Sequence, residues 1–186
     1  MQVTGSLFFA LELLILQGAL GAFDTIYYHE WRARLPAHGS RVSAELELHA
    51  ARDFVYAVVF ATLPILEWRG AWTLVLAGLL LAEILITLAD FIVEDRVRRP
   101  LGGVYPGERA THAVMGIVYG AMLAELAPVM LAWHSLPTEL ADATNVAPHF
   151  VWTLWVMAAG VFVSGLRDLF AARDFEWAAF PWKRAS

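Results

Sequence analysis

Five long apolar stretches constrain the fold of this chain more than any other feature. They cover residues 4–30, 46–66, 71–94, 110–133 and 149–166, and glycine and proline residues separate them. Each stretch approaches the roughly 20 residues that an α-helix needs to cross the hydrocarbon core of a bilayer. The sequence therefore predicts an all-α integral membrane protein with five transmembrane helices in a single domain of residues 1–186.

The composition agrees with this class and argues against others. Hydrophobic residues make up 59% of the chain and charged residues 17%, whereas soluble domains average about 45–50% and about 25%. A formal net charge of −5 disfavours nucleic acid as a partner. The absence of cysteine excludes disulfides, thiolate metal sites and iron–sulfur clusters. Any bound metal would therefore need carboxylate, imidazole, phenol or water ligands.

The basic residues predict an orientation in the membrane. With five spans, the loops after the first and third helices lie on the same side as the C-terminus. Nearly all arginine and lysine residues fall on or beside that side, and Arg69 stands opposite. Because positive charge marks the cytoplasmic face, we expect a multi-pass protein of the cytoplasmic (inner) membrane with its N-terminus outside. Residues 167–186 alternate charged and aromatic residues and are predicted to be an interfacial segment.

Polar residues recur at matching positions in two halves of the chain. A glutamate, a histidine four residues later and a tyrosine seven further on open both the second and the fourth predicted helix. The preceding helices also carry polar residues at equal offsets. The matched residues are Glu45, His49 and Tyr56 with Glu108, His112 and Tyr119, and Gln17, Asp24 and Tyr28 with Glu83, Asp90 and Glu94. The pattern predicts a duplicated helical hairpin, residues 4–66 and 71–133, that forms a four-helix bundle with pseudo-twofold symmetry, followed by a fifth helix.

These polar residues form one stripe on each helix and must face the protein interior. A carboxylate at the centre of a membrane costs about 2.5–3.5 kcal/mol on insertion scales. The carboxylates of Asp24, Glu45, Asp90 and Glu108 carry a charge of −4. Two divalent cations would balance this charge, whereas Arg52 alone would not. His29 and Asp95 point away from the stripes by more than a quarter turn. The predicted metal ligands are Asp24, Glu45, His49, Asp90, Glu108 and His112, with Glu94 and His29 as candidate accessory ligands.

This ligand order resembles that of the ferritin-like di-iron and di-manganese carboxylate proteins. In that class, two helices of a four-helix bundle each supply one glutamate, and the other two supply a glutamate and a nearby histidine. The resemblance implies single carboxylates at Asp24 and Asp90 and a glutamate–histidine pair on each of the other two helices. This chain departs from the pattern in its single aspartates, in its Glu–His spacing of four and in its membrane setting.

The leading functional hypothesis is a membrane di-metal oxidoreductase. The ions are iron, with manganese or zinc as alternatives, and the enzyme would use dioxygen or a peroxide on a lipid-soluble substrate. Arg52 would orient a carboxylate or an anionic substrate group. Tyr56 and Tyr119 would donate hydrogen bonds or relay an electron or proton. An electron-donor protein is the expected partner, and the small residues Gly160 and Ser164 leave room for a homo-oligomer.

Four other hypotheses remain open. A haem-binding electron carrier would use His49 and His112 as axial ligands. A proton or metal-ion transporter would continue its polar residues toward the outer side of the membrane. A metal-dependent lipid hydrolase or transferase would use the ions to activate water or hold a phosphate. Alternatively, the polar residues form only a structural network that ties the helices together.

Overall fold

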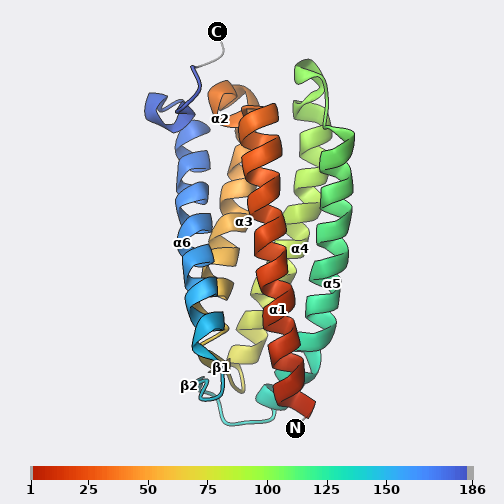
Figure 1. Ribbon diagram of the computed structural model, residues 1–186, viewed down its shortest axis with the longest axis vertical. Helices are drawn as coiled ribbons and strands as arrows, with labels where there is room; N and C mark the ends of the chain where they lie inside the picture. The colour runs from red at the N-terminus through yellow and green to blue at the C-terminus, as the bar shows by residue number, and fades with distance from the viewer. Residues whose placement is uncertain (1, 184–186) are drawn as a thin grey trace.

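Five long helices dominate the structure, so the prediction of an all-α fold is confirmed. The computed structural model describes residues 2–183, with side chains from residue 5 onward (Figure 1). The long helices are α1 (Gln2–Phe23), α3 (Ser43–Thr62), α4 (Trp72–Val97), α5 (Pro106–His134) and α6 (Pro148–Ala171). The shorter helical segments are η1 (Asp24–Arg32), α2 (Leu35–His38), η2 (Gly39–Val42), η3 (Arg99–Leu101) and η4 (Glu176–Ala179).

Several helix ends differ from the ends of the apolar stretches. The first helix continues from α1 through η1, a π-helix, as far as Arg32. The second long helix ends at Thr62, because the chain turns there into strand β1 (Leu66–Trp68), which pairs antiparallel with β2 (Leu140–Asp142). The last helix runs to Ala171, five residues beyond the predicted span and into the segment predicted to be interfacial.

Four of the five helices are long and apolar enough to cross a membrane. They are Gly5–Arg32, Trp72–Val97, Pro106–His134 and Pro148–Ala171. Helix α3 differs because it carries Glu45, Glu47, Arg52 and Asp53 within its 20 residues. A fifth span and the duplication of the bundle remain predictions.

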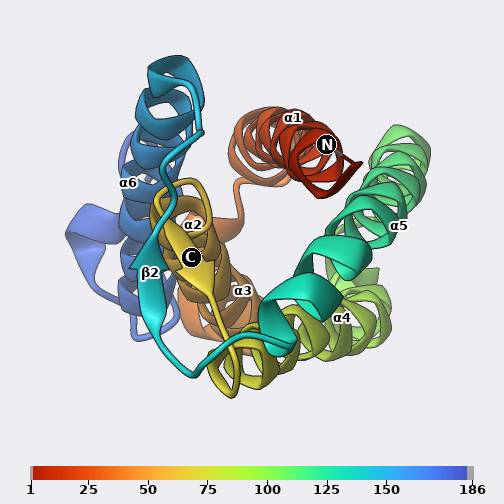
Figure 2. The same cartoon turned by 90° about the horizontal axis from the view of Figure 1, so that it is seen from below.

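The helices run roughly parallel or antiparallel to one another along the long axis of the molecule (Figures 1 and 2). The largest contacts join α1 to α5, and α3 to both α4 and α6. The N-terminus and the β1–β2 sheet lie at one end of the bundle, whereas α2 and the C-terminus lie at the other (Figure 1).

Two apolar clusters enclose the polar residues along α3. The larger cluster includes Tyr56 and Phe60 and extends toward the β-sheet end. The smaller one packs Leu46 against Leu35 and Ala171 near the C-terminal end. His49 and Arg52 lie on α3 between Leu46 and Tyr56, so the polar site occupies the interval between the two clusters.

Candidate metal centre

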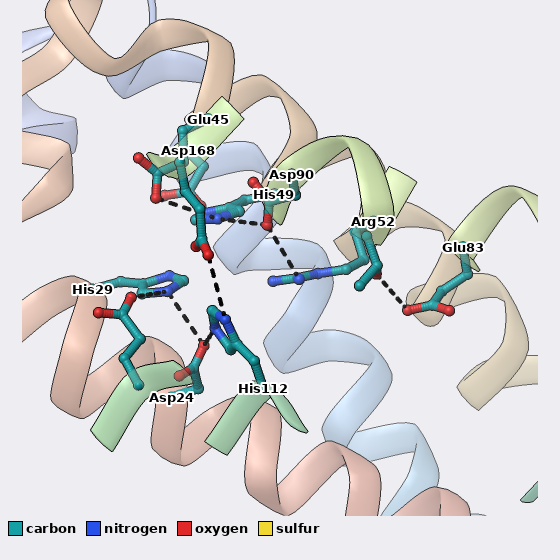
Figure 3. A network of polar contacts seen from close by, with 12 residues as sticks. Asp24, His29, Glu45, His49, Arg52, Glu83, Asp90, His112 and Asp168 are labelled. Atoms are coloured by element: carbon teal, nitrogen blue, oxygen red, sulfur yellow. Dashed lines mark hydrogen bonds and ion pairs between the residues drawn. The ribbon is translucent and has the colours of Figure 1, made fainter. Parts of the chain in front are cut away.

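The residues predicted as metal ligands converge in one buried cluster (Figure 3). They come from four helical segments: η1, α3, α4 and α5. The exposed fractions are 1% for Asp24, 0% for Glu45, 3% for His49, 1% for Asp90, 0% for Glu108 and 7% for His112. The structure thus buries all six together, as the inward-facing stripes predicted.

His29 also lies in the cluster, contrary to the prediction that it points elsewhere. In an α-helix, residues five positions apart are separated by about 140° around the axis. Here Asp24 begins a π-helix, whose hydrogen bonds join residues five apart, as shown by the 2.8 Å bond from the Ala33 amide to the Tyr28 carbonyl oxygen. The wider turn brings His29 Nε2 to 3.2 Å from Asp24 Oδ2. The sequence prediction failed because it assumed α-helical geometry.

One half of the cluster is built around Asp24 and His112. His112 Nε2 lies 3.1 Å from Asp24 Oδ2, and its Nδ1 lies 3.7 Å from Glu94 Oε1. His29 Nε2 is also 3.2 Å from Glu108 Oε1. Candidate ligand atoms of Asp24, His29 and His112 lie within 4.8 Å of one another, and so do those of Glu94, Glu108 and His112. Ligands bound at 2.0–2.2 Å from an ion lie at most about 4.4 Å apart, so both groups have nearly the dimensions of a coordination shell.

The other half of the cluster surrounds His49. Its Nε2 lies 3.3 Å from Asp90 Oδ2 and 3.9 Å from Glu45 Oε1. Its Nδ1 faces Asp168 Oδ2 at 3.7 Å. Arg52 Nη1 contacts the same Asp90 oxygen at 3.4 Å. This half therefore holds one imidazole, three carboxylates and one guanidinium group.

Arg98 joins the two halves and was missed by the sequence reasoning. Its side chain is 1% exposed and donates hydrogen bonds to Glu45 Oε1, from Nη2 at 2.5 Å and from Nε at 2.7 Å. Its Nη1 lies 2.9 Å from Glu108 Oε1. Burial alone would lower the pKa of Arg98, but the bonds to Glu45 and the nearby Glu108 charge raise it above its usual value. Arg98 therefore remains a buried cation between the two glutamates.

The sequence contained a signal for Arg98 and for Asp168, the two residues that the sequence reasoning left out of the cluster. Arg98 follows Glu94 by four residues and so shares its face of the helix, but it lies beyond the end of the apolar stretch. Asp168 follows Ser164 by four residues, but it stands in the segment predicted to be interfacial. Both signals depended on helices that continue past their apolar residues.

A second polar chain leads away from the cluster toward the middle of the bundle. Gln17 Nε2 donates to the Tyr56 hydroxyl at 3.2 Å, and that hydroxyl donates to Glu83 Oε1 at 3.1 Å. The Thr87 hydroxyl also donates to Glu83 Oε1, at 2.9 Å. Tyr119 instead donates to the Leu80 carbonyl oxygen at 3.2 Å. The two tyrosines of the sequence pattern thus have different partners, although their rings are 6.3 Å apart.

The described residues of the cluster carry an excess of negative charge. The six carboxylates of the cluster, opposed by two guanidinium groups, leave a formal charge of −4 while the imidazoles are neutral. These carboxylates belong to Asp24, Glu45, Asp90, Glu94, Glu108 and Asp168. Several buried donor or acceptor atoms lack a hydrogen-bond partner, among them Asp24 Oδ1, Glu45 Oε2, Asp90 Oδ1 and Glu94 Oε2. Buried charged atoms of this kind are stable only when something else compensates them.

Protonation of the histidines compensates only part of this charge. The rings of His29 and His49 stack with centroids 4.5 Å apart and an interplanar angle of 8°. Two unit charges 4 Å apart repel by about 4 kcal/mol at an effective dielectric constant of about 20. The stack therefore opposes simultaneous protonation of both rings, and a negative excess remains.

Comparison with known proteins adds no assignment. No protein-family model, curated protein or solved structure matches the chain.

Proposed function

We propose that this chain is an integral membrane protein that binds two divalent transition-metal ions in the buried cluster and catalyses a redox reaction on a lipid-soluble substrate. The observation that carries the proposal is the approach of Asp24, His29 and His112 ligand atoms to within 4.8 Å of one another in an enclosed, negatively charged site. Carboxylate and imidazole ligands without sulfur suit iron and manganese. Iron is the proposed metal.

The residues divide into two ligand groups in this proposal. Asp24, His29 and His112 hold one ion, with Glu94 and Glu108 beside it. His49 holds the other with Asp90, Glu45 and Asp168. Two divalent cations would offset the formal excess of four negative charges. This division supports the duplicated-hairpin prediction in one respect, because Asp24–His112 and Asp90–His49 are equivalent pairs at 3.1 and 3.3 Å.

The chain's own residues would orient the ions and exclude water from them. Arg98 holds Glu45 and Glu108 in fixed positions, and Arg52 does the same for Asp90. A pair of redox-active ions would supply the electron transfer to an oxidant such as dioxygen. Electrons would come from a partner protein. The positive-inside pattern favours a cytoplasmic-membrane location with the N-terminus outside.

The packing favours this function over a transporter. A transport path would need polar groups that continue through the bundle. Beyond Glu83, the described core toward the β-sheet end is closed by a layer of fully buried apolar side chains. That layer includes Leu11, Leu14, Leu76, Met122 and Leu126, each 0% exposed. On α4, none of the described buried charged residues lies nearer to the β-sheet end than Glu83.

The crowding around the histidines favours small ions over haem. His49 stacks on His29, and carboxylates of Asp90 and Asp168 approach its two ring nitrogens. His112 has Asp24 and Glu94 at its own nitrogens. Acidic groups at these positions suit small metal cations, which carboxylate and imidazole atoms bind directly, whereas a porphyrin needs an open apolar slot.

Elemental analysis of purified protein tests the proposal. Protein from cells supplied with iron, manganese and zinc should contain about two equivalents of metal per chain, mainly iron. The variants His112→Ala and Asp24→Asn should lose at least one equivalent. His134→Ala is the matched control, because His134 contacts the Gly70 carbonyl oxygen near the β-sheet and should leave the content unchanged. Folded, monodisperse wild-type protein without bound metal would show the proposal to be wrong.

A further inference from the structure

Two cavities in the bundle adjoin the polar chain of Gln17, Tyr56 and Glu83. The first, the α1–α6 cavity, has a volume of about 350 Å³ and lies between α1, α3 and α6. The second, the α4–α5 cavity, has a volume of about 270 Å³ and is lined mainly by α4 and α5. Gln17, Arg52, Tyr56 and Met115 line both cavities. The two spaces therefore meet at the same side chains.

Both cavities open onto the apolar outer surface of the bundle. Ile26 and Val156 line the α1–α6 cavity and are 67% and 71% exposed. Leu88 lines the α4–α5 cavity and is 54% exposed. In a membrane these side chains face lipid. An apolar molecule dissolved in the bilayer can enter sideways without crossing water.

Gln17, a residue that lines both cavities, holds an unused hydrogen-bond acceptor. The Glu83 carboxylate accepts from Tyr56 and Thr87, so the Tyr56 proton is committed to Glu83. Gln17 must then donate its amide N–H to the Tyr56 oxygen, which fixes the orientation of its amide group. Gln17 Oε1 is left without a partner, although the residue is only 4% exposed. A ligand that satisfies this atom must donate a hydrogen bond.

The charges along the cavities disfavour an anionic ligand. Arg52 is the one arginine or lysine among the residues that line them, and it is already paired with Asp90. Asp53 lines the α1–α6 cavity and Glu83 lines the α4–α5 cavity. A carboxylate or phosphate headgroup would meet these acids without a free cation to bind it. A neutral hydroxyl group meets no such penalty.

We propose that the cavities bind a neutral, lipid-soluble alcohol or phenol whose hydroxyl group donates to Gln17 Oε1 and whose apolar body lies in the α1–α6 cavity. The volume is in the range of small-molecule sites that bury most of their ligand. His112 and Gln17 both line the adjoining α4–α5 cavity, so a candidate metal ligand and the proposed acceptor residue border the same space. The assignment of this molecule as the substrate rests on the proposed function, but its binding does not require metal.

Binding of a matched pair of probes tests the hydrogen bond. Tritiated 4-nonylphenol and its methyl ether, 4-nonylanisole, have nearly the same apolar body, but only the phenol can donate. Each is titrated into nanodiscs with the protein, and empty nanodiscs correct for partition into lipid. We expect saturable binding of the phenol about tenfold tighter than that of the ether. The variant Gln17→Leu should bring both probes to the weaker affinity. Equal affinity of the two probes for the wild type would overturn the proposal.

Glycine substitutions test the location without disturbing the packing. A Cβ added at Gly160, which lines the α1–α6 cavity, would meet no atom within 4 Å, so Gly160→Leu adds a side chain at the cavity wall without a clash. We expect this variant to lose at least tenfold in phenol affinity. Gly78→Leu is the matched control, because Gly78 also has no atom within 4 Å but lines neither cavity. Unchanged binding in Gly160→Leu would overturn the proposed location.

The same titration separates this inference from the proposed function. Phenol binding that persists in protein stripped by a chelator, or in protein shown to bind no metal, would support the binding site while the metal proposal fails. Metal-loaded protein without saturable phenol binding would overturn the binding site and leave the metal proposal standing.

Discussion

Replacement of Arg98 by leucine should strongly destabilise the protein. Arg98 is 1% exposed and contacts Glu45 and Glu108, both 0% exposed. Removing one partner of a buried ion pair typically costs about 3–5 kcal/mol, because the remaining charge stays buried without compensation. For a chain of this size, each kcal/mol lowers the melting temperature by about 2–4 °C. Arg98→Leu should therefore melt about 6–20 °C below the wild type.

Arg99→Leu is the control for this prediction. Arg99 makes an ion pair with Asp95 at 2.9 Å, but its side chain is 75% exposed. Exposed pairs contribute at most about 1 kcal/mol. Both variants are unfolded thermally and by denaturant in the same detergent after treatment with a chelator, since bound metal would compensate the free glutamates. The double variant Glu45→Gln/Arg98→Leu should recover part of the loss. If Arg98→Leu costs no more than Arg99→Leu, the reasoning on the buried cation is refuted.

Two further predictions concern the polar chain and the membrane orientation. Tyr56→Phe should lower the free energy of unfolding by about 1–3 kcal/mol, because it leaves the buried Glu83 carboxylate short of a donor. Tyr119→Phe removes a hydrogen bond to a backbone carbonyl group and should lower the free energy of unfolding by less. Equal losses for the two variants in denaturant unfolding would contradict this prediction. Because the chain has no cysteine, single-cysteine variants report its topology. Ser135→Cys should react with a membrane-impermeant maleimide in intact cells and Arg99→Cys only after lysis, and the reverse pattern would invert the predicted orientation.

The inward-facing polar residues were predictable because they stand within strongly apolar helices. A charged residue in such a helix must turn away from lipid, so the spacing of Asp24, Glu45, His49 and their counterparts already implied a common interior site. The geometric assumption behind this reasoning was a regular α-helix. It holds along α3, α4 and α5, where the predicted stripes are buried. It fails at η1, where the π-helix rotates His29 into the cluster.

The charge balance of the cluster could be estimated only in part. The sequence reasoning took a charge of −4 from four acidic groups and did not subtract the charge of the nearby Arg52. The structure adds Glu94 and Asp168 to the acids and Arg98 to the bases, so the formal excess of negative charge is again four. The two values agree because omissions of opposite sign cancel. The sequence count left out the two acids Glu94 and Asp168 and also the two bases Arg52 and Arg98.

The amino-acid sequence by itself determined the helical class, the approximate positions of the long helices and the six residues that lie buried together. These follow from local physics: the length of each apolar stretch, the helical period and the cost of placing a charge in lipid. Only the tertiary structure established that His29, Arg98 and Asp168 join them. The position of His29 depends on a change in the helical hydrogen-bond pattern. The positions of Arg98 and Asp168 depend on helices that continue beyond their apolar residues and pack against one another. A local pattern of hydrophobicity encodes neither feature.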